Sequence, residues 1–152
     1  MTQTTDLNPA DCNCLAVRQA ARHVSQYYDQ HLAQAGLRGT QYSILARLGR
    51  MGPLSINALA AMLVLDRTTL GRNILPLQRE GLIEAKPDLQ DRRSKALHLT
   101  AAGTARLRKA AQCWQQAQQG FEAAFGSERA ARMRGLMRNV VATELEAAPA
   151  PG

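Results

Sequence analysis

Apolar residues recur every three to four positions along most of the chain, and this spacing predicts amphipathic helices. The predicted helices cover residues 11–36, 40–52, 56–64, 67–80, 100–125 and 127–148. Asp11 is a candidate N-cap of the first helix, and Gly36 is a candidate C-cap. The pattern changes within residues 82–99, where apolar and polar residues alternate around His98. This alternation, following an extended apolar segment, predicts two strands joined as a β-hairpin.

The third and fourth helices have clear boundary signals. Ser55 and Asp66 are candidate N-caps, because their side-chain oxygens can accept hydrogen bonds from free N–H groups of the first turn. Gly81 is expected to stop the fourth helix. Pro76 breaks a rule inside this helix, since proline cannot donate a hydrogen bond to the carbonyl of Arg72. The helix is therefore expected to kink at Pro76 or to end early.

The order of these elements predicts the fold class. A short helix, a tight turn and a helix with a polar outer face form a helix-turn-helix. The segment PDLQDRRSK, residues 87–95, follows as an arginine-rich hairpin tip. A helix-turn-helix followed by a basic hairpin is a winged helix. We therefore predict a mainly α fold with a small β-hairpin wing, in which N- and C-terminal dimerisation helices flank a winged helix-turn-helix.

A chain of 152 residues is sufficient for one domain with a hydrophobic core. The predicted organisation is one domain at 11–146, with dimerisation helices at 11–36 and 101–146, the winged helix-turn-helix at 38–100, a disordered lead at 1–10 and a disordered tail at 147–152. The outer helices have no DNA-facing role in a minimal winged helix. They are expected to pack together and against a second copy, as a homodimer. The alternative is that they complete a monomeric core.

The charge of the chain favours a polyanionic partner. Nineteen lysines and arginines against 12 acidic residues give a formal net charge of +7. No apolar run approaches membrane-spanning length, and the N-terminus lacks a secretory signal pattern, so no membrane partner is expected. We expect a cytoplasmic protein. Its three cysteines are too few for a disulfide framework and are expected to be thiols.

Catalytic signatures are missing from the sequence. It contains no glycine-rich phosphate loop, no paired histidine–carboxylate motif and no metal signature, so neither an enzyme nor a cofactor or metal is expected. The expected function is sequence-specific binding of double-stranded DNA. The alternative is a nonspecific nucleoid-type protein, which would not prefer one DNA sequence over another.

The outer face of the predicted helix 67–80 carries candidate DNA-reading side chains. They are Arg67, Thr68, Thr69, Arg72 and Asn73. Arg72 can pair with guanine O6 and N7, and Asn73 can pair with adenine. The threonines can contact phosphates or a thymine methyl group. The alternative interpretation is a solvated helix face.

The hairpin tip carries three candidate cationic contacts, Arg92, Arg93 and Lys95. Arginine suits a narrow minor groove, where the negative potential is enhanced. Asp91 is expected to orient Arg93, since phosphates repel a carboxylate. An ordinary charged hairpin tip is the alternative. Gln41 and Ser55, at the starts of the second and third helices, are further candidates for phosphate contacts.

Four segments carry a resemblance to a known family: GLRGTQYSILARL, LSINALAAML, DRTTLGRNILPLQREGLI and DRRSKALHLTAAG. With them, residues 11–146 resemble the MarR family of bacterial transcription regulators. The family pattern Asp-x-Arg followed by Leu-Thr is met by Asp91, Arg93, Leu99 and Thr100, and the family also carries proline at the position of Pro76. Leu89 and Gln90 depart from it, at wing positions that are often charged in relatives.

The resemblance implies a homodimer with a winged helix on each subunit, bound to pseudo-palindromic operator DNA, usually as a repressor. It also implies release by a small aromatic ligand or by an oxidant. A ligand pocket is implied between the dimerisation helices and the winged helix, with Arg18, Tyr28, His31 and Tyr42 as candidate lining residues.

The alternative of oxidant sensing concerns Cys12 and Cys14, at the start of the first helix. Helix N-termini favour the reactive thiolate. Cys14 and Tyr28 match, by the resemblance, the reactive cysteine and one of the two tyrosines of hydroperoxide-sensing relatives, whereas Gly39 stands where the second tyrosine would be. Two incidental thiols are the plainer interpretation. Metal binding by Cys-x-Cys would need further ligands, such as His23, His31 or a second subunit.

Overall fold

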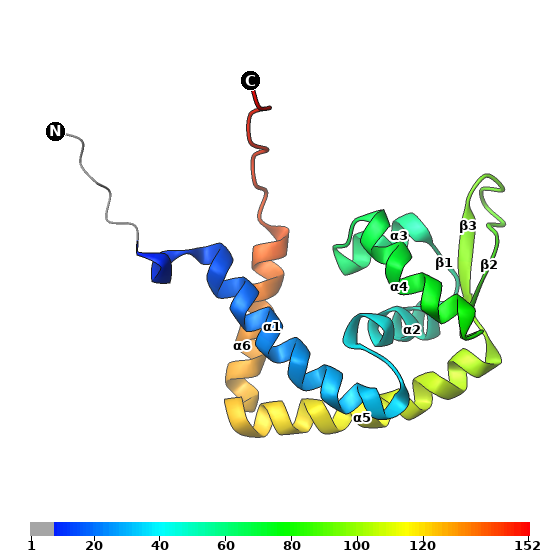
Figure 1. Ribbon diagram of the computed structural model, residues 1–152, viewed down its shortest axis with the longest axis horizontal. Coiled ribbons are helices and arrows are strands. Elements are labelled where there is room, and N and C mark those ends of the chain that lie inside the picture. Colours follow the sequence, from blue (N-terminus) through cyan, green and yellow to red (C-terminus); the bar gives the residue numbers. More distant parts are fainter. Residues whose placement is uncertain (1–7) are drawn as a thin grey trace. The chain divides into compact units, whose positions relative to one another are not determined.

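The computed structural model describes residues 8–152 of the chain. Residues 1–7 belong to the predicted disordered lead and lie outside the described residues. The chain divides into two compact units, with the boundary between Ala117 and Gln118. The first unit holds helices α1 to α4, three short strands and most of α5; the second holds the end of α5 and α6 (Figure 1). The predicted mainly helical fold with a small wing is confirmed.

The first helix, α1 (Asn13–Leu32), begins two residues later than predicted. Pro9–Asp11 form a 3-10 turn, although residues 9 and 10 belong to the predicted disordered lead. Cys12 rather than Asp11 caps α1, and its Sγ accepts a hydrogen bond from the N–H of Leu15 at 3.3 Å. Proline at the first position of this turn has the φ that a helical turn requires. A second 3-10 turn, Ala33–Ala35, ends at Gly36 with φ +71°, which confirms the predicted stop.

Three helices form the core of the first unit: α2 (Gly39–Met51), α3 (Ile56–Leu63) and α4 (Arg67–Arg79). The predicted N-caps of α3 and α4 are confirmed, with Ser55 Oγ accepting from Ala58 N at 3.1 Å and Asp66 from Thr69 N at 2.8 Å. Each helix buries one apolar stripe. The core includes Ile44, Leu45 and Leu48 of α2, Leu59 and Ala60 of α3, and Leu70, Ile74 and Leu77 of α4.

Helix α4 continues through Pro76, so the prediction that it could end early there is wrong. The proline removes one backbone donor, but its own carbonyl still accepts from the N–H of Glu80 at 3.0 Å. Pro76 lies between the buried residues Ile74 and Leu77 in the sequence of α4. Tertiary packing of this stripe outweighs the loss of one backbone hydrogen bond.

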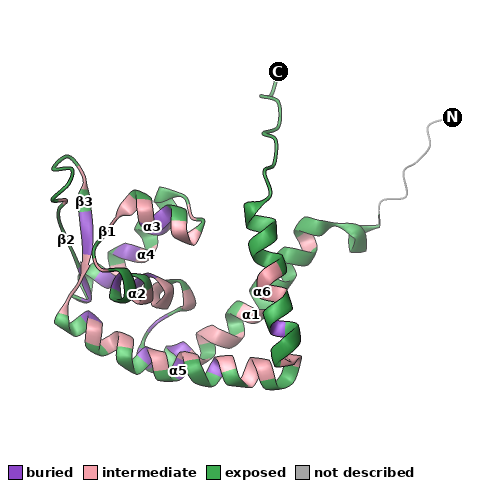
Figure 2. Cartoon of the chain, turned by 180° about the vertical axis from the view of Figure 1, so that it is seen from behind, coloured by how far each residue is buried: buried purple, intermediate pink, exposed green. Residues whose placement is uncertain are grey.

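The sheet has one strand more than the sequence predicted. Strands β2 (Ile83–Pro87) and β3 (Lys95–Leu99) form the expected antiparallel hairpin. A third strand, β1 (Leu54–Ser55), pairs with the other edge of β3, in the order β1-β3-β2. The hairpin extends beyond the helices as the wing (Figure 1). Its base is buried through Ile83 and Leu97, and its tip is exposed (Figure 2).

The two last helices are α5 (Ala101–Phe125) and α6 (Ser127–Ala142), separated by Gly126 at φ +102°. Helix α6 is shorter than predicted, because Thr143 is extended and its hydroxyl donates to the carbonyl of Asn139 at 2.7 Å. In the second unit, Phe121 and Phe125 stack with centroids 5.3 Å apart, and Arg129 lies 4.3 Å over the Phe125 ring. Most side chains of α6 are exposed (Figure 2).

Candidate nucleic-acid interface and ligand cavity

Helix α4 presents one continuous exposed face. Its exposed residues are Arg67, Thr68, Gly71, Arg72, Leu75, Gln78 and Arg79. At 100° per residue they fall within one sector opposite the buried stripe. Arg67, Thr68 and Arg72 were predicted from the sequence, and the fold places all three on this face. A helix of this kind, with arginine forks projecting outward, can bind base edges in a major groove.

Asp66 fixes the start of this face. One carboxylate oxygen accepts from the N–H of Thr69 at 2.8 Å and the other accepts from the Thr69 hydroxyl at 2.7 Å. These bonds favour the charged form, first the backbone bond and then the side-chain bond, and hold the pKa of Asp66 below its ordinary value. The Thr69 hydroxyl is therefore engaged by the cap. It is less available for DNA than the hydroxyl of exposed Thr68.

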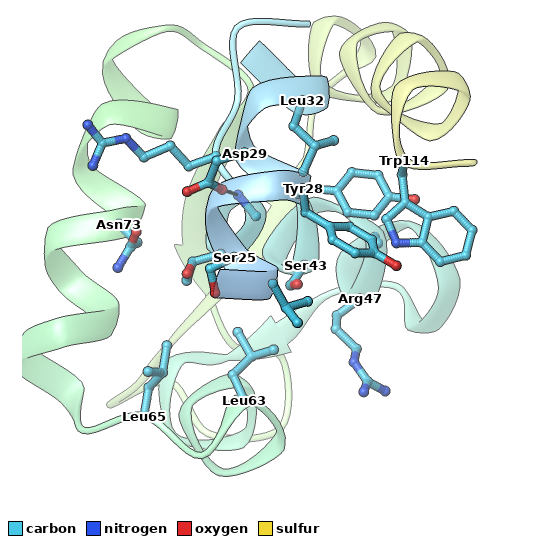
Figure 3. Close-up of a pocket in the computed structure, with 16 residues that line it drawn as sticks. Ser25, Tyr28, Asp29, Leu32, Ser43, Arg47, Leu63, Leu65, Asn73 and Trp114 are labelled. Carbon is cyan, nitrogen blue, oxygen red and sulfur yellow. Dashed lines mark hydrogen bonds between the residues drawn. The ribbon is translucent and has the colours of Figure 1, made fainter. Parts of the chain in front are cut away.

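Asn73 lies apart from the other predicted reading residues. It is half-buried, on the side of α4 that also carries buried Leu70 and Leu77. Its Nδ2 donates to the carbonyl of Thr69 at 2.9 Å. Asn73 also lines a cavity together with residues of α1 and α2 (Figure 3). The fold thus separates Asn73 from Arg67, Thr68 and Arg72.

The C-terminal end of α4 is fastened to the start of α5. The Thr100 hydroxyl donates to Gly81 O at 2.6 Å and accepts from Gly103 N at 3.0 Å, while Thr100 N donates to Leu82 O at 3.1 Å. One turn further along α5, Arg106 Nη1 lies 3.2 Å from a carboxylate oxygen of Glu80. The Leu-Thr-x-x-Gly pattern of the sequence thus forms a joint, which holds the end of α4 against α5.

The wing places its three predicted cations in solvent. Arg92, Arg93 and Lys95 are exposed, and Leu89 at the tip is 99% exposed. Asp91 holds Arg93 through the backbone, because its Oδ1 accepts from Arg93 N at 3.0 Å. A groove of about 600 Å³ lies beside the wing and is lined by Arg67, Arg93 and Lys95 among others. Arg67 of α4 therefore shares one groove with Arg93 and Lys95 of the wing, whereas Arg72 and Arg92 lie outside its lining.

The two predicted phosphate contacts have different surroundings. Ser55 lines the same groove, although its hydroxyl already accepts from Ala58 N as the cap of α3. Gln41 is half-buried, and its Oε1 accepts from Arg38 N at 3.0 Å as part of a capping box. Gln41 is therefore occupied in closing the start of α2.

A cavity of about 760 Å³ lies among α1, α2, the α3–α4 region and α5 of the first unit (Figure 3). Tyr28, Tyr42 and Trp114 give it an aromatic wall, and Tyr42 stacks on Trp114 with centroids 6.1 Å apart. Burial raises the pKa of Tyr42, so its phenol stays neutral. The cavity also has a polar part, where Asp29 Oδ1 accepts from Gly39 N at 2.7 Å. Such a cavity suits a small molecule with a ring and a polar end.

Two of the four predicted pocket residues line this cavity, and two do not. Tyr28 and Tyr42 line it, whereas Arg18 is exposed on α1 and is not among the lining residues. His31 Nδ1 is 3.0 Å from Tyr27 O, and its ring contacts Tyr27 rather than the cavity. The arginines that do line it are Arg38 and Arg47. Sequence spacing alone could not separate the sides of α1 and α2 that face the cavity.

Cys12 and Cys14 are exposed at the start of α1, whereas Cys113 is buried in the core. Within residues 8–152, no group of three or more histidine, cysteine or acidic side chains is placed to hold a metal ion. Among the same residues, no helix is long and apolar enough to cross a membrane.

Comparison with known proteins identifies the family to which this fold belongs. A family model described as the MarR family matches residues 37–95. The M. tuberculosis transcriptional regulator MosR, in a crystal structure in complex with DNA, is 34% identical; the match covers 89% of this chain and 100% of that one, with a TM-score of 0.75. The chain belongs to the MarR family.

Two more distant structures share the MarR fold. PcaV from Streptomyces coelicolor, solved in complex with its natural ligand, is 23% identical over 90% of this chain and 96% of that chain, with a TM-score of 0.79. Bordetella bronchiseptica BpsR, studied for regulation of its DNA binding by 6-hydroxynicotinic acid, is 19% identical over 91% of this chain and 99% of that chain, with a TM-score of 0.81. At these identities the likeness concerns the fold alone. No curated protein sequence matches the chain.

The exposed face of this MarR-family α4 includes residues that the sequence reasoning missed. Gly71 lies in the middle of the face and Leu75, Gln78 and Arg79 continue it toward the C-terminal end. A glycine inside an amphipathic helix costs about 1 kcal/mol relative to alanine, which is a signal of close approach or of a special packing need. Apart from its chain neighbours and the backbone of its own helix, no atom of the described residues lies within 4 Å of the position that a Gly71 Cβ would take. The space beyond Gly71 is therefore open, and no packing contact of the described residues requires glycine there.

Proposed function

We propose that the protein is a sequence-specific DNA-binding regulator, which represses transcription and is released by a small aromatic ligand. The observation that supports this most directly is the exposed face of α4, with Arg67, Thr68 and Arg72 beside a wing that carries Arg92, Arg93 and Lys95. A recognition helix in the major groove and a basic hairpin in the minor groove would bind one stretch of duplex DNA. The DNA complex of MosR, at 34% identity, supports the same partner.

A homodimer on pseudo-palindromic DNA belongs to this proposal. Large apolar side chains remain exposed on the terminal helices. Val17 of α1 is 44% exposed, and Leu136, Met137, Val140 and Val141 of α6 are between 42% and 63% exposed. Contiguous exposed apolar surface is typical of a protein interface. Two copies joined by these helices would place two α4 helices on successive major grooves, about 34–36 Å apart.

The cavity beside α4 is the proposed site of the releasing ligand. Its aromatic wall, formed by Tyr28, Tyr42 and Trp114, suits a planar ring. Arg47 at the same cavity is exposed and can pair with an acidic group. A small aromatic acid or a phenol therefore fits both features.

Fluorescence anisotropy tests the DNA-binding proposal. The purified protein is titrated onto a labelled duplex from upstream of its own gene and onto a scrambled duplex of the same length. A regulator should bind its operator roughly 10³- to 10⁷-fold more tightly than random DNA. If the protein binds every candidate operator near its gene no more tightly than it binds scrambled DNA, the result would instead support a nonspecific nucleoid-type protein.

Oxidant sensing is the second proposed function, and it is supported by the exposure of both Cys12 and Cys14. A hydroperoxide would oxidise the Cys14 thiolate to a sulfenic acid and itself be reduced to an alcohol. A second thiol, such as Cys12, would then condense with the sulfenic acid to a disulfide and release water. Tyr28 lines the cavity and lies fourteen residues along α1 from Cys14, about 21 Å at 1.5 Å per residue, so it does not assist Cys14 of its own chain.

The same anisotropy assay distinguishes the two functions. Protein treated with an organic hydroperoxide is compared with reduced protein, with Cys14→Ser and with Cys12→Ser. The sensor would be established if oxidation abolished operator binding and reductant restored it, while Cys14→Ser kept its operator binding after the same oxidation. Oxidised wild-type protein that binds as tightly as reduced protein would leave the ligand-controlled regulator.

A further inference from the structure

Asn73 was assigned to DNA reading from the sequence, but the fold places it in the wall of the ligand cavity. Among the described residues, no other residue of α4 lines this cavity. In Figure 3, Asn73 lies on one side of the cavity and Trp114 on the other, with Ser25 and Asp29 drawn between them. Asn73 therefore belongs to two structures at once. It is part of the helix that presents Arg72 outward, and part of the wall that a bound ligand would touch.

The one side-chain hydrogen bond of Asn73 leaves its amide oxygen and a second amide N–H for a ligand. Its Nδ2 is engaged by the carbonyl of Thr69 at 2.9 Å, whereas its Oδ1 makes no hydrogen bond with any residue in the described part of the chain. Asp29 has a similar arrangement, since only its Oδ1 accepts a hydrogen bond, from Gly39 N. Both atoms without a partner are acceptors. A hydroxyl group or a ring N–H of a ligand can therefore donate a hydrogen bond to either oxygen.

Asn73 is also connected to the N-terminal end of α4. The carbonyl that it binds belongs to Thr69, whose N–H and hydroxyl are both held by the capping carboxylate of Asp66. These bonds join the cavity wall to the first turn of α4, where Arg67 and Thr68 project outward. A force on the Asn73 amide thus acts on the end of the helix that carries the proposed DNA contacts.

We infer that Asn73 is the coupling residue of the regulator rather than a DNA-reading residue; this inference rests on the proposed function of the cavity. A hydroxylated aromatic ligand, with its ring against Tyr28 and Trp114, donates hydrogen bonds to Asp29 of α1 and to Asn73 of α4. The ligand thereby holds one spacing between α1 and α4. It lowers DNA affinity to the extent that this spacing differs from the spacing that the operator requires.

The first test separates DNA reading from coupling and needs no ligand. Operator and scrambled DNA are titrated with wild-type protein, Asn73→Ala and Arg72→Ala. Arg72→Ala is the matched control on the outward face, and loss of a bidentate base contact should reduce the operator preference roughly 5- to 150-fold. Asn73→Ala should leave that preference within about twofold of wild type, as for a side chain that does not touch DNA. A loss as large as that of Arg72→Ala would overturn the inference.

The second test fills the polar end of the cavity covalently. Ser25 is an exposed residue of α1 that lines the same cavity as Asn73, so Ser25→Trp places an indole where the ligand would bind. Ser25→Trp should weaken operator binding, and adding Asn73→Ala should restore most of the loss by removing the contact with α4. The double-mutant cycle measures this coupling directly. Thermal unfolding shows whether each variant is folded, and Ser25→Phe serves as a second filling variant.

The outcomes are distinct. If filling the cavity leaves operator binding unchanged, or weakens it equally with and without Asn73, the coupling role is wrong. If wild-type protein does not distinguish operator from scrambled DNA, the proposed function fails before the coupling is reached. Titration with 6-hydroxynicotinic acid and 4-hydroxybenzoic acid adds a chemical check: a probe that displaces wild-type protein from its operator should displace Asn73→Ala less, while still raising its melting temperature.

Discussion

Replacing Gly103 with alanine should destabilise the protein, although alanine is the better helix former. Gly103 is buried near the start of α5, where this helix meets the turn that follows α4. An ideal Cβ at Gly103 would lie 2.0 Å from the carbonyl oxygen of Leu82 and 2.7 Å from a methyl group of Leu99. The first of these contacts is with main chain, which cannot rotate away as a flexible side chain can.

The magnitude follows from the distances. An ordinary contact begins at 3.4 Å, so the Leu82 carbonyl and α5 must separate by 3.4 − 2.0 = 1.4 Å. That movement strains the 3.1 Å bond from Thr100 N to Leu82 O and the neighbouring 2.6 Å bond from the Thr100 hydroxyl to Gly81 O. Overpacking costs about 1–3 kcal/mol, and backbone movement places this site at the upper end. The helix propensity of alanine returns about 1 kcal/mol, which leaves a net loss of about 2 kcal/mol.

Thermal unfolding followed by circular dichroism measures the effect. A loss of about 2 kcal/mol should lower the melting temperature by about 4–8 °C for a protein of this length. Protein concentration is held constant, because association of subunits makes the melting temperature concentration-dependent. Gly71→Ala is the matched control: the substitution is the same and also lies within a helix, but no atom of the described residues beyond its own helix backbone and chain neighbours lies within 4 Å of the new methyl group. It should gain about 1 kcal/mol.

The two glycine variants should therefore shift the melting temperature in opposite directions. A Gly103→Ala protein as stable as wild type would show that α5 and the Leu82 turn separate freely. In that case the joint formed by Thr100, Gly103 and Arg106 would not hold the end of α4.

Three further predictions concern DNA binding and acid stability. Gly71→Ala should weaken operator binding while raising the melting temperature, since its added methyl group projects from the middle of the exposed face of α4; anisotropy that shows unchanged affinity would place DNA elsewhere. Arg93→Ala should lower affinity on most sequences and reduce the slope of log K against log salt by about 1, and an unchanged slope would remove Arg93 from the phosphate contacts. Asp66→Asn should lower the melting temperature at pH 7 more than at pH 3. The folded-state pKa of Asp66 is depressed, so its carboxylate stabilises the fold at pH values above its ordinary pKa. This contribution is lost as the pH falls through the folded-state pKa. Equal effects at both pH values would show that the cap does not depend on the charge.

The starts of α3 and α4 and the stop at Gly36 could be predicted because their signals are local, whereas the start of α1 and the end of α6 were not. Ser55 and Asp66 accept hydrogen bonds from residues three positions ahead, and Gly36 takes a positive φ that favours glycine. The buried stripe of α4 was also readable, since Leu70, Ile74 and Leu77 repeat at the period of the helix. Exposed Arg67 and Arg72 follow from the same period, as the opposite side of that stripe.

Positions at the edge of a stripe could not be assigned in this way. Asn73 is polar and lies between the buried and exposed sectors of α4, so its surroundings depend on which neighbouring element covers that edge. The fold places the cavity formed with α1 and α2 there, and Asn73 becomes a wall residue. Strand β1 was missed for a related reason: two residues carry no pattern of their own, and Leu54 and Ser55 are a strand only because β3 lies beside them.

The sequence by itself therefore determined which segments are helices, where α3 and α4 start and which charges the helices carry, because capping, periodicity and composition act within a few residues. Only the tertiary structure decided which of those polar groups meet. It brought Arg106 of α5 to Glu80 at the end of α4, Asp29 of α1 to the start of α2, and Asn73 to the cavity. These contacts join residues that are far apart in the chain or on different helices, and the packing of apolar surfaces selects them.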